Sequence, residues 1–354
     1  MSTGALACGP VRRLAPAGRR RVGPVMAGLC VVLALCAAIS LSLGASGVGP
    51  WQMLSRDLGP ADTAIVLNIR LPRLCLGAMV GASLAVSGAL MQGLFRNPLA
   101  DPGLVGVSSG AGLGAICAIV LGGALPVGLT AMAGPYLVAL FAFFGGLIST
   151  LVLYHVATRG GQTSVATMLL AGIVMGALAG ALSGIMVYLA DDTQLRELTF
   201  WSLGSLGGAT WVKVWASAPL LLGAIVLAPL CAHGLNAMAL GEATARHMGV
   251  RVERVKTASI VLVAAGTGAA VAVSGGIGFV GIVVPHILRL LIGPDHRALL
   301  PAAALLGAAL LIGADTAARL IVAPAELPIG ILMALIGAPV FLWILLRRRD
   351  GLEI

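Results

Sequence analysis

The chain has 354 residues, of which 59% are hydrophobic and only 10% are charged. Soluble domains carry roughly a quarter charged residues, so this chain has too few charges to cover a water-soluble globule. The composition excludes a soluble enzyme and a disordered chain. A net charge of +9 would indicate nucleic-acid binding in a soluble protein, but here the positions of the charges matter more than their sum.

Helices that cross a bilayer need about 20 mostly apolar residues, and the chain offers about ten such segments in succession. The segment at 278–292 is short, and Gly275, Gly276 and Pro285 flank or interrupt it. We therefore predict an all-α integral membrane protein with about ten transmembrane helices. Their expected positions are residues 24–46, 72–95, 104–124, 134–157, 164–190, 210–232, 256–273, 278–292, 300–323 and 328–346.

The polar segments are too short to bury a core of their own. We therefore expect a single transmembrane domain over residues 24–346, with a cytoplasmic segment at 234–255. A basic arm, residues 1–23, precedes this domain, and a tail, residues 347–354, follows it.

The positions of the basic residues predict the orientation of these spans. With ten spans, sixteen Lys and Arg residues lie on the side of the N-terminus and six lie on the other side. Because cytoplasmic loops are enriched in Lys and Arg, we expect both termini in the cytoplasm. The basic net charge is then a signal of orientation, and we expect no nucleic-acid partner.

Motifs for catalysis and nucleotide binding are missing from the chain. Lys213 and Lys256 are the only lysines and neither follows a glycine, so there is no phosphate-binding G-x-x-x-x-G-K-[ST] loop. One G-x-S-x-G match, Gly106–Gly110, opens an apolar span and lacks the strand that a catalytic serine turn requires. The six cysteines are scattered, without a metal-binding spacing. We expect no catalytic site, metal or cofactor in this chain.

Two polar clusters lie at the ends of the second predicted span. Arg70 and Arg73 flank Pro72 at its outer start, where they could pair with carboxylates of a partner or extend to lipid headgroups. At the inner end, Pro98 and Pro102 terminate the helix. They shape a cytoplasmic turn that either lines a path or simply connects two helices.

Two further patterns lie in the middle of the chain. Gly172, Gly176, Gly180 and Gly184 place a glycine at every fourth position of one helix, which serves either static close packing or a helix that lines a pathway and shifts. Residues 235–250 form the longest inner loop, and short helices there would expose Met238, Leu240 and Met248. They could offer these side chains to a soluble partner or lie on the membrane surface.

Several motifs, in the same order along the chain, resemble the FecCD family, the permease subunits of bacterial ABC importers for iron–siderophore complexes, haem and vitamin B12. The resemblance covers nearly everything from about residue 60 to the C-terminus. The motifs are RLPR (70–73), GASLAVSGALMQ (81–92), NPLADPGLVGVSSGAG (97–112), ALGEATARHMGV (239–250), GGIGFVGIVVPHILRL (275–290), DHRALLP (295–301) and ELPIGILMALIGAPVFLW (326–343).

This resemblance implies the fold of a vitamin-B12-importer-like (type II) permease that forms a homodimer around a central pathway. Two cytoplasmic ATP-binding subunits, which bind ATP and Mg, and a periplasmic substrate-binding protein would complete the importer, with membrane lipid around it. The implied roles are docking of the binding protein for Arg70, Arg73 and Arg319; contact with the ATPase for Gly241, Glu242, Arg246 and Gly249; a cytoplasmic gate for Asn97, Leu99, Thr163 and Ser164; and a pathway-lining helix for Gly172, Gly176, Gly180 and Gly184.

The segment 192–211 resembles the haem-importing branch of the family, so we expect import of haem or an iron–siderophore complex. A corrinoid importer of the same family is the alternative substrate class. From other classes, an ion-coupled secondary transporter remains an alternative, although ionisable residues within the predicted spans are scarce. We expect Asp315 and Arg319 to form an i,i+4 pair near the outer end of their span.

Overall fold

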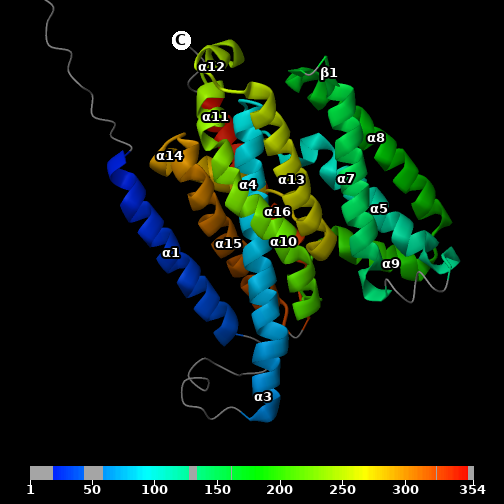
Figure 1. The fold of residues 1–354 in the computed structure, drawn as a ribbon. Helices are drawn as coiled ribbons and strands as arrows, with labels where there is room; N and C mark the ends of the chain where they lie inside the picture. The colour runs from blue at the N-terminus through cyan, green and yellow to red at the C-terminus, as the bar shows by residue number, and fades with distance from the viewer. Residues whose placement is uncertain (1–18, 44–58, 127–133, 161, 324, 350–354) are drawn as a thin grey trace, which may run out of the picture.

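Long helices lie side by side along one direction in the computed structural model, which describes residues 19–43, 59–126, 134–160, 162–323 and 325–349 (Figure 1). One antiparallel hairpin, β1 (Thr158–Arg159) with β2 (Gln162–Thr163), lies at an end of the bundle. The longer helices are α1 (Arg19–Ser42), α4 (Leu71–Leu94), α5 (Val107–Leu121), α7 (Leu137–Ala157), α8 (Val165–Leu189), α10 (Trp211–Leu227), α13 (Val252–Ser274), α15 (His296–Ile321) and α16 (Ile329–Arg349). The shorter elements are α3 (Pro60–Ile65), η1 (Val66–Arg70), η2 (Pro102–Val105), η3 (Gly122–Ala124), η4 (Gly134–Tyr136), α9 (Asp192–Ser202), η5 (Ala228–Cys231), α11 (Ala232–Met238), α12 (Glu242–His247) and α14 (Val280–Ile292).

The helices confirm the predicted all-α membrane fold. Eight helical stretches in the described residues are long and apolar enough to cross a membrane, and two shorter apolar helices, Val280–Ile292 and Ile329–Leu342, match the other two predicted spans. The first helix begins at Arg19, inside the predicted arm. Residues 1–18, the end of the first predicted span and the last five residues of the tail lie outside the described residues.

The second span begins earlier than predicted. The sequence analysis started it at Pro72, a residue that suits a first helical position. The structure instead has one continuous helical stretch over Ala61–Leu94, with Pro72 in its interior. Directly before Leu71 lies a wide π turn, Val66–Arg70, in which the Leu71 N–H donates to the Val66 carbonyl. Such a turn shifts the hydrogen-bond ladder, and here the chain continues through the proline.

Helix α4 is the centre of the bundle (Figure 1). Of its apolar window, 78% is buried, against 6% for α1 and 17% for α8. Close contacts between glycines allow this burial, because a Cβ at Gly81 would overlap the backbone of Gly307 on α15, and one at Gly88 would overlap Gly281 on α14. Small residues let helix backbones approach closely inside membranes, so these glycines determine where α14 and α15 lie.

A polar network fixes the start of α15 against α11. Asp295 caps α15 by accepting a hydrogen bond from the Arg297 N–H at 3.0 Å, and Asn236 of α11 donates to the same carboxylate at 2.6 Å. Asn236 also accepts from the His296 N–H at 3.0 Å. The network therefore ties α11 to the start of α15.

We expect Asp295→Ala to lower the free energy of unfolding by about 1 kcal/mol, the usual cost of losing such a cap. The Arg297 N–H, followed by Asn236, lowers the pKa of the Asp295 carboxyl. A lowered folded-state pKa means that the stabilisation is present above the ordinary pKa of an aspartate and is lost as the pH falls through the folded-state value. Thermal unfolding of the detergent-solubilised protein between pH 7 and pH 3 tests this. An equal loss of stability at both pH values would contradict it.

Candidate functional site

The segment 234–255 lies at one end of the bundle, which we call the α12 end; the opposite end, with α9 and the start of α4, is the α9 end (Figure 1). The segment contains most of α11, the short helix α12 and the start of α13. Gly241 has φ +109° and Gly249 has φ +82°, conformations that side chains other than glycine rarely adopt. These two glycines bound α12 and set its angle to α11 and α13.

The exposed apolar side chains of this segment agree with the sequence prediction at two of three positions. Leu240 is 67% exposed and Met248 is 55% exposed. Met238, however, is fully buried, because it lies on the face of α11 that packs into the main core. The exposed apolar surface that the sequence predicts is therefore formed by Leu240 and Met248 only, one on either side of α12.

Two charged residues of α12, Glu242 and Arg246, lie close to three residues from other elements. We call this group the Lys256 cluster; its other members are Glu253, Lys256 and Thr163. Lys256 is 2% exposed, and its Nζ lies 2.8 Å from Glu242 Oε2 and 3.5 Å from Glu253 Oε1. Arg246 lies 3.4 Å from Glu253 and 3.9 Å from Glu242. The sequence analysis included Glu242, Arg246 and Thr163 but missed Glu253 and Lys256. Lys256 is the first residue of the otherwise apolar span predicted at 256–273, and that charge was the available signal.

The predicted gate residues lie in two connections at this same end. The Asn97 side chain accepts from the Leu99 N–H at 3.0 Å, which closes a tight turn after α4. Thr163 ends β2 and is buried, whereas Ser164 is exposed and caps α8 by accepting from the Thr167 N–H at 3.2 Å. The structure thus explains the local geometry of all four residues, and their function as a gate stays a prediction.

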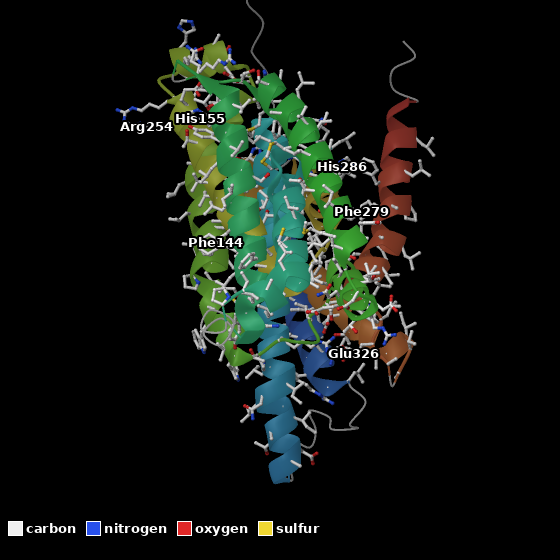
Figure 2. The ribbon with its side chains drawn as sticks, turned by 90° about the vertical axis from the view of Figure 1, so that its right-hand side faces the viewer. Phe144, His155, Arg254, Phe279, His286 and Glu326 are labelled. Atoms are coloured by element: carbon white, nitrogen blue, oxygen red, sulfur yellow. The ribbon has the colours of Figure 1, made fainter. Side chains whose placement is uncertain are left out.

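Two of the three arginines that the sequence analysis assigned to docking, Arg73 and Arg319, are joined in a network with Asp315 and Glu326, which we call the arginine cluster. Arg73 Nε lies 3.0 Å from both carboxylate oxygens of Asp315, and its Nη1 lies 2.8 Å from Glu326 Oε1. The predicted pair of Asp315 and Arg319 is confirmed, at 3.2 Å. Figure 2 places Glu326 toward the α9 end, opposite His155 and Arg254.

These arginines differ from the expected surface residues. Arg70 and Arg73 are 5% and 7% exposed. Arg70 and Arg319 donate to backbone carbonyls of Leu41 and Ser40 at the end of α1, positions where cations stabilise the last turn of a helix. The reason is electrostatic, because arginines among apolar helices must find acceptors within the protein. The described contacts connect α1, α4 and α15, while docking remains a prediction.

The glycine row of α8 lies on an open face of the described structure. A Cβ at Gly180 or Gly184 would meet no atom within 4 Å, and one at Gly176 would only touch Ser109 Oγ at 4.0 Å. The same helix exposes Ile173 and Val174, which are 67% and 66% exposed. Close packing within one copy of the chain therefore does not account for these glycines, which leaves them available to a second copy or to a pathway.

Asp101 is a deep ionisable residue that the sequence analysis placed in a cytoplasmic turn. It lines a cavity of ≈ 320 Å³ together with Trp201 and Ser202, which end α9, and Phe279, which has φ +67°. Burial raises the pKa of its carboxyl, opposed by the hydrogen bond from the Gly103 N–H at 2.8 Å. The turn after α4 therefore folds back into the bundle. Hydropathy did not reveal this because it reports composition and not depth.

The fold defines a multi-span membrane protein with a polar cluster at each end, without a cluster of His, Cys, Asp or Glu that could hold a metal among the described residues. Comparison with known proteins identifies the family. The model of the FecCD transport family matches residues 32–347. The chain belongs to this family, and it is a permease of an ABC importer.

Individual relatives cover almost the full chain. The hemin transport system permease HmuU of Yersinia pestis is 46% identical over 93% of this chain and 98% of its own length. The vitamin B12 import system permease BtuC of Klebsiella pneumoniae is 42% identical over 95% of this chain and 97% of its own length. A solved structure described as an inward-facing conformation of a metal-chelate type ABC transporter is 31% identical, with a TM-score of 0.82 over 92% of this chain and 99% of that chain.

Proposed function

We propose that this chain is the permease of an importer that moves haem, or an iron chelate of similar size, across the bacterial inner membrane. The observation that carries the proposal is the 46% identity to the hemin permease over 93% of the chain. The resemblance of segment 192–211 to the haem-importing branch supports the same substrate.

In this proposal the α12 end faces the cytoplasm, with both termini on that side. The bias of sixteen basic residues against six supports this orientation. Two copies of the chain would form a homodimer along the open face of α8, and two ATP-binding subunits would contact α12 through Leu240 and Met248. A periplasmic substrate-binding protein would dock on the α9 end. ATP and Mg would be bound by the ATP-binding subunits.

Deletion of the gene in its native host tests the substrate. We expect uptake of radiolabelled hemin to fall to the level of cells that lack this transport system. Uptake should return when the chain is expressed from a plasmid. Uptake of a ferric siderophore and of cyanocobalamin by the same cells provides the comparison, and unchanged hemin uptake would refute haem as the substrate.

Vitamin B12 is the second candidate, because two B12-type permeases are 42% and 44% identical to this chain. Loss of cyanocobalamin uptake with normal hemin uptake would establish it. Hemin uptake that continues in membrane vesicles after removal of the ATP-binding subunits would instead support an ion-coupled secondary transporter.

A further inference from the structure

The buried ammonium group of Lys256 contacts two segments to which the proposed function gives different roles, the cytoplasmic gate and the contact with the ATP-binding subunit. Lys256 lies in the second turn of α13, two residues after Arg254, which Figure 2 places at the α12 end. Its Nζ donates to the carbonyl oxygen of Thr163 at 2.8 Å and to Glu242 Oε2 at 2.8 Å. Thr163 ends the hairpin that precedes α8, and Glu242 begins α12. The two contacts therefore connect the predicted gate to the predicted ATPase contact.

Glu253 completes the connection from the other side of Thr163. Its Oε2 accepts from the Thr163 N–H at 2.9 Å, while its Oε1 lies 3.5 Å from Lys256 Nζ and 3.4 Å from Arg246. Both backbone polar groups of Thr163 are thus held by side chains of α13. The end of the hairpin cannot move relative to α13 without breaking hydrogen bonds to charged groups, which are stronger than neutral ones.

Burial makes this connection stiff. The Lys256 side chain is 3% exposed, whereas those of Glu242 and Glu253 are 29% and 30% exposed. An ammonium removed from water is stable only while it stays paired and hydrogen-bonded. If α12 is displaced, Lys256 must therefore follow Glu242 or lose a partner that water cannot fully replace.

A cavity of ≈ 670 Å³ lies beside this connection. The hairpin and the start of α8 line it with Arg159, Gln162, Thr163, Ser164 and Thr167, and α12 lines it with Glu242 and Arg246. The hairpin and α12 thus face each other across open space, with Lys256 and Glu253 at its border. The side-chain bridge, and not a packed apolar interface, relates the positions of the two elements.

We propose that Lys256 is a positioning residue that transmits displacement of α12 to the hairpin and to the first turn of α8. The inference rests on the proposed function, because it takes α12 as the contact with the ATP-binding subunit. Ser164 follows Thr163 directly and caps α8, so movement of Thr163 reaches α8 through one residue. Displacement of Glu242 moves Lys256, and Lys256 in turn moves Thr163; we call this pair of contacts the Lys256 link.

Spin-label distances in the assembled importer test the link. Labels are attached at Arg159→Cys and His247→Cys, both exposed positions, in a chain whose six native cysteines are replaced by alanine. In the otherwise native chain we expect one narrow distance distribution with and without ATP, because hairpin and α12 move together. In Lys256→Met, the distribution should broaden and shift with ATP, and hemin transported per ATP should fall at least about fivefold, the lower end of typical coupling between sites.

Matched variants distinguish a Lys256 that transmits movement between α12 and the hairpin from a Lys256 that only stabilises the fold. Lys256→Arg keeps a cation with several donors and should restore most of the coupling, while Lys213→Met, at the only other lysine, should change neither measurement. Glu242→Gln removes one ionic partner and keeps the shape, so it tests the same link if Lys256→Met does not assemble. It should lower transport per ATP, as Lys256→Met does.

The outcomes distinguish this inference from the proposed function. If the native chain does not assemble with an ATP-binding subunit, the proposed function fails. If the native importer works, but Lys256→Met or Glu242→Gln leaves the distance distribution narrow and the transport per ATP unchanged, the link alone is refuted. Lys256→Met could also be less stable, with stability restored in Lys256→Arg and normal transport per ATP in both variants. That result would show that Lys256 only stabilises the fold, and it would also refute the link.

Discussion

Replacement of Arg73 by methionine is expected to lower the free energy of unfolding by about 3–5 kcal/mol, the cost of removing one partner of a buried ion pair. Arg73 supplies the close contacts that neutralise Asp315, whose side chain is 4% exposed, and it also holds Glu326. Without it, the Asp315 carboxylate keeps only Arg319, at 3.2 Å, as a charged partner among the described contacts. Thermal unfolding of the detergent-solubilised protein measures the loss.

Two comparisons make this prediction specific. Arg196→Ala removes an exposed arginine from the same end of the bundle and should change the stability by less than about 0.5 kcal/mol. Asp315→Asn in the Arg73→Met background removes the carboxylate charge that has lost its contacts with Arg73, so the double variant should lose less stability than the sum of the two single changes. A loss below about 1 kcal/mol in Arg73→Met would show that the arginine cluster is not what holds α4 and α15 together.

The arginine cluster changes how the docking hypothesis should be tested. Reversal of charge at Arg70, Arg73 and Arg319 together would disturb α1, α4 and α15 through the contacts described above. A loss of binding-protein docking in that triple variant would then follow from damage to the fold. Glu326, whose side chain is 46% exposed, is the part of the cluster that a docking partner reaches most readily.

The sequence alone predicted the family and an apolar helix at each of the ten expected positions, and eight of these helices are long enough to cross a membrane. Hydropathy and the twenty-residue length rule were sufficient for the spans, since each helix signals its own presence through local composition. The limits of single helices were less accurate, as the π turn before Leu71 shows. The hydrophobic pattern is the same on both sides of that turn, so the pattern does not indicate where the second span begins.

Partners distant in sequence could not be predicted in this way. Arg73 and Asp315 are 242 residues apart, and Lys256 and Thr163 are 93 residues apart. Neither pair has a spacing that indicates contact, because spacing rules describe neighbours on one helix and not helices that pack together. The sequence analysis placed Arg73 at the outer surface because it lies at the predicted start of a span, and neither that position nor the family motif reveals the distant residues that surround its side chain.

Replacement of Gly88 by alanine is expected to lower the free energy of unfolding by about 3 kcal/mol or more, the upper range for overpacking. A Cβ at this position would overlap the carbonyl oxygen, Cα and carbonyl carbon of Gly281. Backbone atoms of α14 cannot rotate away as a flexible side chain could. Helix α14 would have to move as a body, which would also disturb its packing against α15.

The same contact predicts a milder effect from its other side. A Cβ at Gly281 would lie 3.2 Å from both the Leu84 carbonyl oxygen and Pro102 Cδ, which is tight but not overlapping, so Gly281→Ala should cost about 1 kcal/mol. Gly184→Ala meets no atom within 4 Å and should raise stability by up to about 1 kcal/mol, because alanine loses less backbone entropy in a helix. Thermal unfolding of the three variants should therefore give this order, and equal effects would contradict the helix contact. If Gly184→Ala is more stable yet transports less, the glycine row of α8 serves the moving pathway rather than the fold of a single copy.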